Sequence, residues 1–238
     1  MISRNLRSIA QVLAVCLISM LLWACNDAAD QPLRVASHEW PGYEPLHLAD
    51  QLGFYDEKLI HVYELSSASA NIRAFRNGYI DVVALTLDEA LLLLQDRLPI
   101  KVLLVMDVSN GADAVLAHAP LQQLADLRGK RIGLENMALG AYVLTRTLDK
   151  SHLSLADIET LFIPFDQHEQ AFLKHDIDAL VTFEPIKSKL QAAGAKVLLD
   201  SKALPNEIID VLVIHESALK THDEAVKALI DGWFKALD

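Results

Sequence analysis

Short, mostly apolar runs recur along the chain between residues 33 and 214. Each run has the length of a strand, and glycine, proline or polar residues bound it. Runs that are apolar almost throughout are typical of strands buried on both faces by helices. The expected strands span residues 33–37, 60–65, 80–85, 101–106, 114–117, 131–134, 160–163, 179–183, 196–199 and 211–214.

Helical patterns fill the intervals between these runs. Ser69 is placed to begin a helix that Gly78 ends, and the sequence Thr86-Leu87-Asp88-Glu89 has the form of a capping box. A second capping-box pattern begins at Thr221 and opens the last helix. The alternation predicts an α/β fold with mostly parallel sheets. The other expected helices span residues 45–52, 120–127, 139–148, 168–174 and 185–193.

The apolar stripe of the last helix continues to Leu237 without a capping signal. Helices usually end near a glycine or asparagine, and neither follows here. We therefore expect the protein to continue beyond residue 238, and a helix that ends the protein is the alternative.

The first 24 residues have the pattern of a secretory signal peptide. Arg4 and Arg7 precede an apolar stretch over residues 9–24, which is shorter than the ~20 residues needed to cross a bilayer. The sequence Leu21-Leu22-Trp23-Ala24-Cys25 then resembles a bacterial lipobox, in which the cysteine receives the lipid. There are two alternatives. The cysteine merely ends the apolar stretch, or the stretch is an uncleaved anchor.

Composition and charge narrow the classes of function. The chain has a net charge of −11, and removal of Arg4 and Arg7 with the leader makes it −13. Such an acidic chain is unsuited to a nucleic-acid partner, which requires clustered Lys and Arg. The only cysteines are Cys16 and Cys25, so the mature domain has no disulfide, thiol nucleophile or zinc–thiolate site.

Catalytic motifs are missing from the sequence. There is no G-x-S-x-G elbow and no phosphate-binding P-loop, and the His168-Glu169 pair lacks the second histidine of H-E-x-x-H. The nine histidines are scattered rather than clustered. We therefore expect a protein without enzymatic activity, cofactor or metal.

Seven segments carry a specific resemblance, in the same order along the chain. They are Trp40-Pro41-Gly42-Tyr43-Glu44-Pro45-Leu46 with Leu48-Ala49 and Gly53-Phe54-Tyr55 after it, residues 74–81, residues 86–89, residues 107–113, residues 127–133, Phe183-Glu184-Pro185, and residues 200–201 with 210–213. Together they resemble the ABC-transporter solute receptors for nitrate, sulfonates, taurine and thiamine pyrimidine precursors.

The resemblance implies a type II periplasmic-binding-protein fold, with two α/β lobes, a hinge, and the ligand in the cleft between them. The hinge would lie near residues 113–118 and 205–210. The expected organisation is a signal peptide over residues 1–24, a lipidated tether over 25–32, lobe I over 33–115 and 205–238, and lobe II over 116–204.

Ligands of such sheets bind at the carboxyl ends of the strands. Serines there can equally be helix caps, and aspartates can equally stabilise turns. The acidic side chains are not accompanied by Lys or Arg, which favours a ligand with an amine, amidine or aminopyrimidine group, or an aminosulfonate held at the Gly140 amide. The candidate ligand-binding residues are Trp40, Tyr43, Glu44, Ser66, Ser69, Asp88, Asp107, Gly140, Tyr142, Glu184 and Asp210.

The resemblance also implies the partners. We expect a monomeric, periplasmic receptor, anchored to a bacterial membrane by lipid on Cys25, that delivers a small molecule to a permease and ATPase complex. A sensory lipoprotein that signals occupancy of the same cleft is one alternative. An enzyme similar to the thiamine-pyrimidine synthases is another, although the export signal and the absence of a cysteine from the mature domain disfavour it.

The lipoprotein hypothesis predicts the result of metabolic labelling. Cells that express the full chain should incorporate labelled palmitate into it, and Cys25→Ala should abolish the label because the acceptor thiol is lost. The same label on a Cys16→Ala variant serves as the control. Label retained by Cys25→Ala would refute lipidation at this residue.

Overall fold

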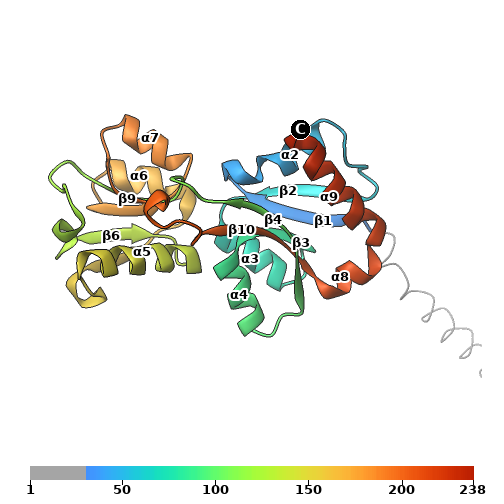
Figure 1. The fold of residues 1–238 in the computed structure, drawn as a ribbon, viewed down its shortest axis with the longest axis horizontal. Helices are drawn as coiled ribbons and strands as arrows, with labels where there is room; N and C mark the ends of the chain where they lie inside the picture. The colour runs from blue at the N-terminus through green and yellow to red at the C-terminus, as the bar shows by residue number, and fades with distance from the viewer. Residues whose placement is uncertain (1–30) are drawn as a thin grey trace, which may run out of the picture.

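The computed structural model describes residues 31–238, so the predicted leader and Cys25 lie outside the described residues. Two five-stranded sheets lie side by side, each with its own helices (Figure 1). In spatial order the first sheet contains β2 (Ile60–Leu65), β1 (Leu33–His38), β3 (Val82–Thr86), β10 (Ile209–His215) and β4 (Ile100–Val108).

The second sheet is built from the middle of the chain. Its strands in spatial order are β7 (Glu159–Phe162), β6 (Arg131–Leu134), β8 (Ala179–Thr182), β5 (Ala114–Ala117) and β9 (Lys196–Asp200). This arrangement confirms the predicted two-lobed α/β fold, in which the chain enters the second sheet after β4 and returns to the first at β10.

Both sheets are mixed, with one strand in each running against the other four. In the first, β10 runs antiparallel to β3 and β4, and in the second β5 runs antiparallel to β8 and β9. The other pairings, around β1 and β6, are parallel. An apolar run indicates that a strand is buried but not the direction in which it runs. The sequence therefore could not identify β5 and β10 as antiparallel to their neighbours.

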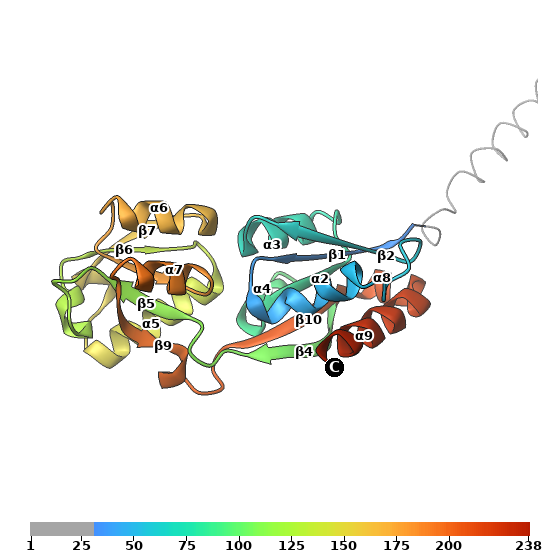
Figure 2. The same cartoon turned by 90° about the horizontal axis from the view of Figure 1, so that it is seen from above.

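Helices cover the sheets in the positions that the alternation predicts. Around the first sheet lie α2 (Glu44–Gln51), α3 (Ala68–Arg76), α4 (Leu87–Gln95), α8 (Glu216–Thr221) and α9 (Asp223–Leu237), and around the second α5 (Ala138–Ser151), α6 (His168–Leu173) and α7 (Ile186–Ala192). Figure 2 shows α2 and α9 together on the first sheet, with the start of α2 near the junction of the lobes and α9 away from it. Within residues 31–238, none of the helices has the length and apolar character required to span a bilayer.

Three local predictions were wrong. Ser67, not Ser69, caps α3, because its side chain accepts a hydrogen bond from the Ala70 amide at 3.2 Å. Only a 3-10 turn, Leu124–Leu127, forms within the helix expected over 120–127. The helix expected from Thr221 begins at Asp223 instead, because α8 occupies Glu216–Thr221.

Buried apolar side chains join the two lobes. Trp40, from the loop after β1, packs edge-on against Phe183 of the second lobe with ring centroids 5.6 Å apart. Phe183 in turn stacks on Phe165 at 4.2 Å. These rings belong to one cluster of buried side chains that extends through both sheets, so the lobes are in contact rather than merely linked.

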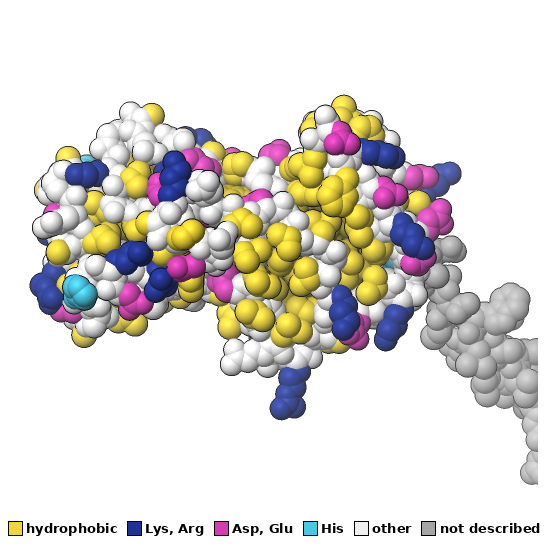
Figure 3. Space-filling model, in the orientation of Figure 1, with side chains coloured by type: hydrophobic (Ala, Val, Ile, Leu, Met, Phe, Trp, Pro, Cys, Tyr) yellow, Lys and Arg dark blue, Asp and Glu magenta, His cyan; other side chains and the backbone are white. Residues whose placement is uncertain are grey.

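Exposed apolar side chains gather on the lobe that carries α4 and β4 (Figure 3). Leu91, Leu92 and Leu94 of α4 are 41–55% exposed, and Val102, Val105 and Val108 of β4 are 42–59% exposed. β4 is also an edge strand of its sheet.

The contact between α9 and Tyr55, in the loop between α2 and β2, depends on the missing side chain of Gly232. A Cβ at this position would overlap the ring of the buried Tyr55. We expect Gly232→Ala to destabilise the protein by about 1–3 kcal/mol, the range for overpacking a core. Urea denaturation measures the change.

A variant that lacks the Tyr55 ring provides the control for this prediction. Tyr55→Leu removes the overlapping ring atoms, so adding Gly232→Ala to Tyr55→Leu should cost less than adding it to the native chain. Equal costs in both backgrounds would rule out the steric explanation.

Candidate functional site

A pocket lies between the lobes and encloses about 550 Å³ of empty space, the solvent at its mouth included. Its walls combine side chains of both sheets with residues of the two segments that connect them. The first lobe contributes His38, Trp40, Tyr43, Ala68, Thr86, Glu89 and, from β10, Asp210, the second contributes Glu135, Met137, Leu139, Gly140, Val143, His168, Val181, Thr182 and Phe183, and the connections contribute Asp113 and Ile208.

Four carboxylates line this pocket, and all are buried. Glu89, Asp113, Glu135 and Asp210 are 1–7% exposed. No Lys or Arg among residues 31–238 lines the same pocket. The site is therefore an acidic cavity without an opposing cationic side chain.

The two pocket histidines do not supply a positive charge either. Burial lowers the pKa of both His38 and His168 to about 4. His168 Nε2 lies 3.0 Å from the Ile163 carbonyl oxygen and must carry its hydrogen there, so Nδ1 accepts from the Thr182 hydroxyl at 3.1 Å. Both rings are consequently neutral at neutral pH.

Burial holds protons on the acids. The pKa of Glu89 rises to about 8, chiefly through desolvation, with further contributions from the charges of Asp88 and Glu135. The pKa of Asp113 rises to about 7 for the same principal reason. Desolvation and the charge of Asp107 raise the pKa of Asp210 as well, even though Tyr43 donates a 2.5 Å hydrogen bond to Asp210 Oδ1.

Three polar atoms of the pocket have no hydrogen-bond partner. They are the Thr86 hydroxyl oxygen, Asp113 Oδ2 and Asp210 Oδ2. Thr86 and Asp210 are neighbours, since they are paired in the register of β3 and β10. A buried polar atom without a partner is costly, so these atoms mark the positions where a bound polar group would be stabilised.

Gly42 shapes the aromatic wall. A Cβ at Gly42 would overlap the Asp107 carboxylate and crowd the Trp40 indole nitrogen. Because Gly42 leaves this space, Asp107 Oδ2 accepts a hydrogen bond from Trp40 Nε1 at 3.1 Å and fixes the ring at the edge of the pocket.

The lobes are also bridged by hydrogen bonds beside the pocket. Glu135 Oε1, on the second lobe, accepts from the Ser69 hydroxyl at 2.7 Å and from the Ser69 amide at 3.2 Å. Ser69 thus contacts a pocket carboxylate without lining the pocket itself.

Of the eleven residues predicted to bind ligand, the structure places Trp40, Tyr43, Gly140 and Asp210 in the pocket lining. Asp107 and Ser69 lie behind the lining and contact Trp40 and Glu135, respectively. Glu44 and Ser66 are exposed outside the pocket, as the side-chain burial shows.

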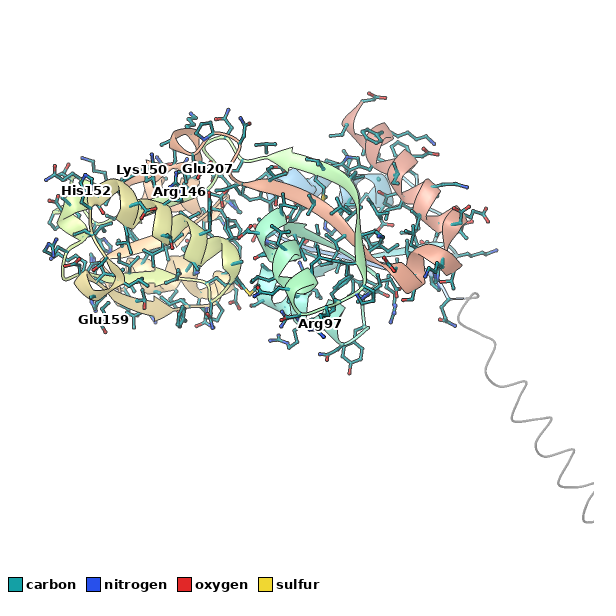
Figure 4. All side chains as sticks on the ribbon, turned by 60° about the horizontal axis from the view of Figure 1, so that its bottom comes forward. Arg97, Arg146, Lys150, His152, Glu159 and Glu207 are labelled. Carbon is teal, nitrogen blue, oxygen red and sulfur yellow. The ribbon has the colours of Figure 1, made fainter. Side chains whose placement is uncertain are left out.

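The remaining three also lie outside the lining. Asp88 is on the first turn of α4 with Oδ2 buried and unpaired. Glu184 accepts hydrogen bonds from the amide and hydroxyl of Ser188. Tyr142 donates to Glu207 at 2.5 Å, where Arg146 also binds that carboxylate through two nitrogens (Figure 4).

Sequence reasoning missed His38, Glu89, Asp113 and Glu135. Glu89 was interpreted only as part of a capping box, and the structure shows that its carboxylate does accept from the Thr86 amide at 3.2 Å. Asp113 and Glu135 both lie at strand ends, which is a detectable signal. Whether such a residue faces the cavity depends on how the two lobes meet. Among residues 31–238, no three His, Cys, Asp or Glu side chains are placed to hold a metal ion.

Comparison with known proteins places the chain in a family. A model of the NMT1-like family matches residues 26–238. A protein of Brucella abortus (strain 2308) that is named as a binding protein is 25% identical over 181 residues, covering 71% of this chain and 56% of the relative. The chain thus spans little more than half the length of this curated relative.

Solved structures share the fold. The alkanesulfonate-binding protein SsuA from Xanthomonas axonopodis pv. citri, bound to MOPS, matches with a TM-score of 0.73 and 22% identity over 87% of this chain and 73% of that chain. The nitrate-binding protein NrtA from Synechocystis PCC 6803 matches with a TM-score of 0.72 and 15% identity over 87% and 61%. The desulfurization enzyme DSZB has a TM-score of 0.61 at 19% identity, over 85% of this chain and 75% of that chain, so binding proteins and an enzyme share this architecture.

The buried acids predict how stability depends on pH. Between the ordinary glutamate pKa of 4.5 and the folded value of about 8, the folded chain retains the Glu89 proton that the unfolded chain loses, so stability falls as pH rises towards the folded pKa. One such group contributes a slope of about 1.4 kcal/mol per pH unit. Glu89→Gln should remove this contribution to the pH dependence of the free energy of unfolding. Urea unfolding at several pH values measures it.

The exposed Glu44 supplies a matched control. Glu44→Gln should leave the native slope unchanged, because the Glu44 side chain is exposed to solvent. An unaltered slope in Glu89→Gln would show that Glu89 is ionised in the folded protein.

Proposed function

The chain belongs to the NMT1-like family, and we propose that it is an extracytoplasmic solute-binding protein that delivers a small amine-bearing molecule to an ABC importer. The observation that carries the proposal is the pocket with four buried carboxylates and, among the described residues, no lining Lys or Arg. The proposed solute carries an amine, amidine or aminopyrimidine group, whose N–H donors match carboxylate acceptors.

The electrostatics of the pocket favour this class over simple anions. A nitrate or sulfonate group placed beside Asp113 and Asp210 would be repelled unless both carboxylates were protonated. A cationic nitrogen instead would satisfy the unpartnered oxygens of these residues and allow them to ionise. The aromatic rings of Trp40 and Phe183 would pack against the apolar part of the solute.

Uptake would proceed through opening and closing of the lobes. We propose that the solute enters when the lobes separate and that closure buries it, with Trp40–Phe183 packing and the Ser69–Glu135 hydrogen bonds stabilising the closed form. The closed receptor would then dock on the permease, while lipid on Cys25 would hold it at the membrane. The lobes proposed for this movement are residues 33–115 with 205–238, and residues 116–204.

Thermal shifts of the purified mature chain test the solute class. An amine such as 4-aminopyrimidine or benzylamine at 100 times its Kd should add about 2.7 kcal/mol of stability, or about 5–10 °C in Tm. Nitrate and MOPS should produce no such shift, because the pocket lacks a counter-charge for them.

Two variants test whether the thermal shift arises from binding in the pocket. Trp40→Ala should reduce the shift by removing a wall of the pocket, whereas Glu44→Ala, on the exposed surface, should not. A large shift with nitrate or MOPS and none with amines would disprove the amine assignment.

A further inference from the structure

His38 is a buried histidine of the pocket lining and the last residue of β1. It thus lies at the carboxyl end of a strand, where α/β sheets bind their ligands. Its ring packs edge-on against Tyr43 with ring centroids 5.3 Å apart, and against Phe183 of the other lobe at 5.8 Å. These two contacts fix the plane of the imidazole in the pocket wall.

Asn71 determines which nitrogen of His38 carries the hydrogen. The Asn71 side chain is buried on α3 and suits its neighbours in one orientation, in which its nitrogen donates to the Ser37 carbonyl oxygen at 3.2 Å and its oxygen accepts from the His38 amide at 3.2 Å. The same oxygen lies 3.1 Å from His38 Nδ1, so Nδ1 must be the donor. Because burial lowers the pKa of His38 to about 4, the ring holds this one hydrogen at neutral pH, and Nε2 carries a lone pair.

Nε2 lies on the side of the ring opposite Asn71. Asn71 is not part of the pocket lining, so Nδ1 is turned behind the wall and the edge that carries Nε2 is the one that reaches the cavity. Within residues 31–238, no protein group donates a hydrogen bond to Nε2. An accepting nitrogen without a partner in a pocket marks a position where a donor of the solute gains a hydrogen bond.

This acceptor differs from the carboxylates of the same pocket. A carboxylate binds a cation as an ion, whereas the neutral imidazole accepts a hydrogen bond without any change of charge, so it suits a neutral donor. A hydroxyl group fits better than an amide, because one bond to Nε2 satisfies its oxygen, whereas an amide brings a separate carbonyl oxygen. Few donors remain for such an oxygen, since the hydroxyls of Tyr43 and Thr182 already donate to other pocket side chains.

We propose that His38 determines specificity for a hydroxyl group of the solute, which donates a hydrogen bond to Nε2 while the pocket carboxylates hold the ammonium group. The solute is therefore an amino alcohol, and the spacer between its two polar groups packs against the rings of Trp40 and Phe183. This inference rests on the proposed function and narrows its solute class to amines that also carry a hydroxyl group.

Isothermal titration calorimetry with matched probes tests this recognition. Each pair differs in a hydroxyl group against a methyl group of similar size, and the spacer varies between pairs. We expect the hydroxyl compound of at least one pair to bind the native chain about 3- to 10-fold more tightly, as one hydrogen bond contributes. The pairs are 3-(aminomethyl)phenol with 3-methylbenzylamine, 4-(aminomethyl)phenol with 4-methylbenzylamine, 3-aminopropan-1-ol with 1-aminobutane, and 4-aminobutan-1-ol with 1-aminopentane.

A matched pair of variants assigns the preference to His38. His38→Phe removes the acceptor and keeps a ring between Tyr43 and Phe183. In this variant the methyl compound should bind more tightly than its hydroxyl partner, because the hydroxyl group loses water without gaining a hydrogen bond. His61→Phe makes the same substitution at an exposed position of β2 and should keep the native preference for the hydroxyl compound. Thermal melts of both unliganded variants establish that they are folded.

NMR of the native chain tests the hydrogen assignment without any substitution. Long-range proton–nitrogen correlation spectra of the isotope-labelled protein distinguish a ring nitrogen that carries a hydrogen from one that carries a lone pair. After sequential assignment of the His38 signals, we expect a hydrogen on Nδ1 and a lone pair on Nε2. Binding of the hydroxyl compound should shift the Nε2 signal upfield, because that nitrogen then accepts a hydrogen bond.

The outcomes separate this inference from the proposed function. If the methyl compounds bind as tightly as their hydroxyl partners in all four pairs, the amino-alcohol inference is overturned while amine recognition stands. A hydroxyl preference that His38→Phe retains, or a hydrogen on Nε2 of the native ring, would overturn the role of His38. If none of the eight amines binds, both proposals fail.

Discussion

Withdrawal of four carboxylates from water at the junction of two sheets is the constraint on which the rest of the cleft depends. Burying an ionised carboxylate without a partner is expensive, so the group neutralises or finds a counter-charge. In this chain, burial raises the pKa of Glu89, Asp113 and Asp210, and the pocket lining among residues 31–238 includes no Lys or Arg. Protonation of these acids therefore lessens the cost of burying them.

The backbone around the pocket makes this arrangement possible. The Thr86 amide and the Tyr43 hydroxyl each donate to one carboxylate, and Ser69 donates to a third from the opposite lobe. These neutral donors lessen the cost of burial without supplying a charge. Gly42 has a parallel role, since the space that it leaves lets Asp107 orient Trp40.

Much of the fold could be predicted from local pattern, because apolar runs and caps depend on neighbouring residues. The strands β2, β5 and β6 have the predicted bounds, and Glu89 accepts from Thr86 as the capping-box pattern indicates. The antiparallel direction of β5 and β10 follows from the two connections between lobes, which no local pattern records. Local pattern also identified part of the site, because Trp40 and Tyr43 directly follow a strand. The orientation of Asp113 and Glu135 could not be predicted, because it depends on the contact between two lobes that are distant in sequence.

The Arg146–Glu207 pair has a mechanical consequence. Arg146 binds both oxygens of Glu207 from α5, and Glu207 belongs to the segment that leads into β10. This segment is therefore fastened to the second lobe up to residue 207, while β10 is part of the first sheet from Ile209. In the proposed opening of the lobes, an intact Arg146–Glu207 pair would leave the residues around Ile208 to take up the bending of this connection. Ile208 also lines the pocket, so such bending would reshape its wall.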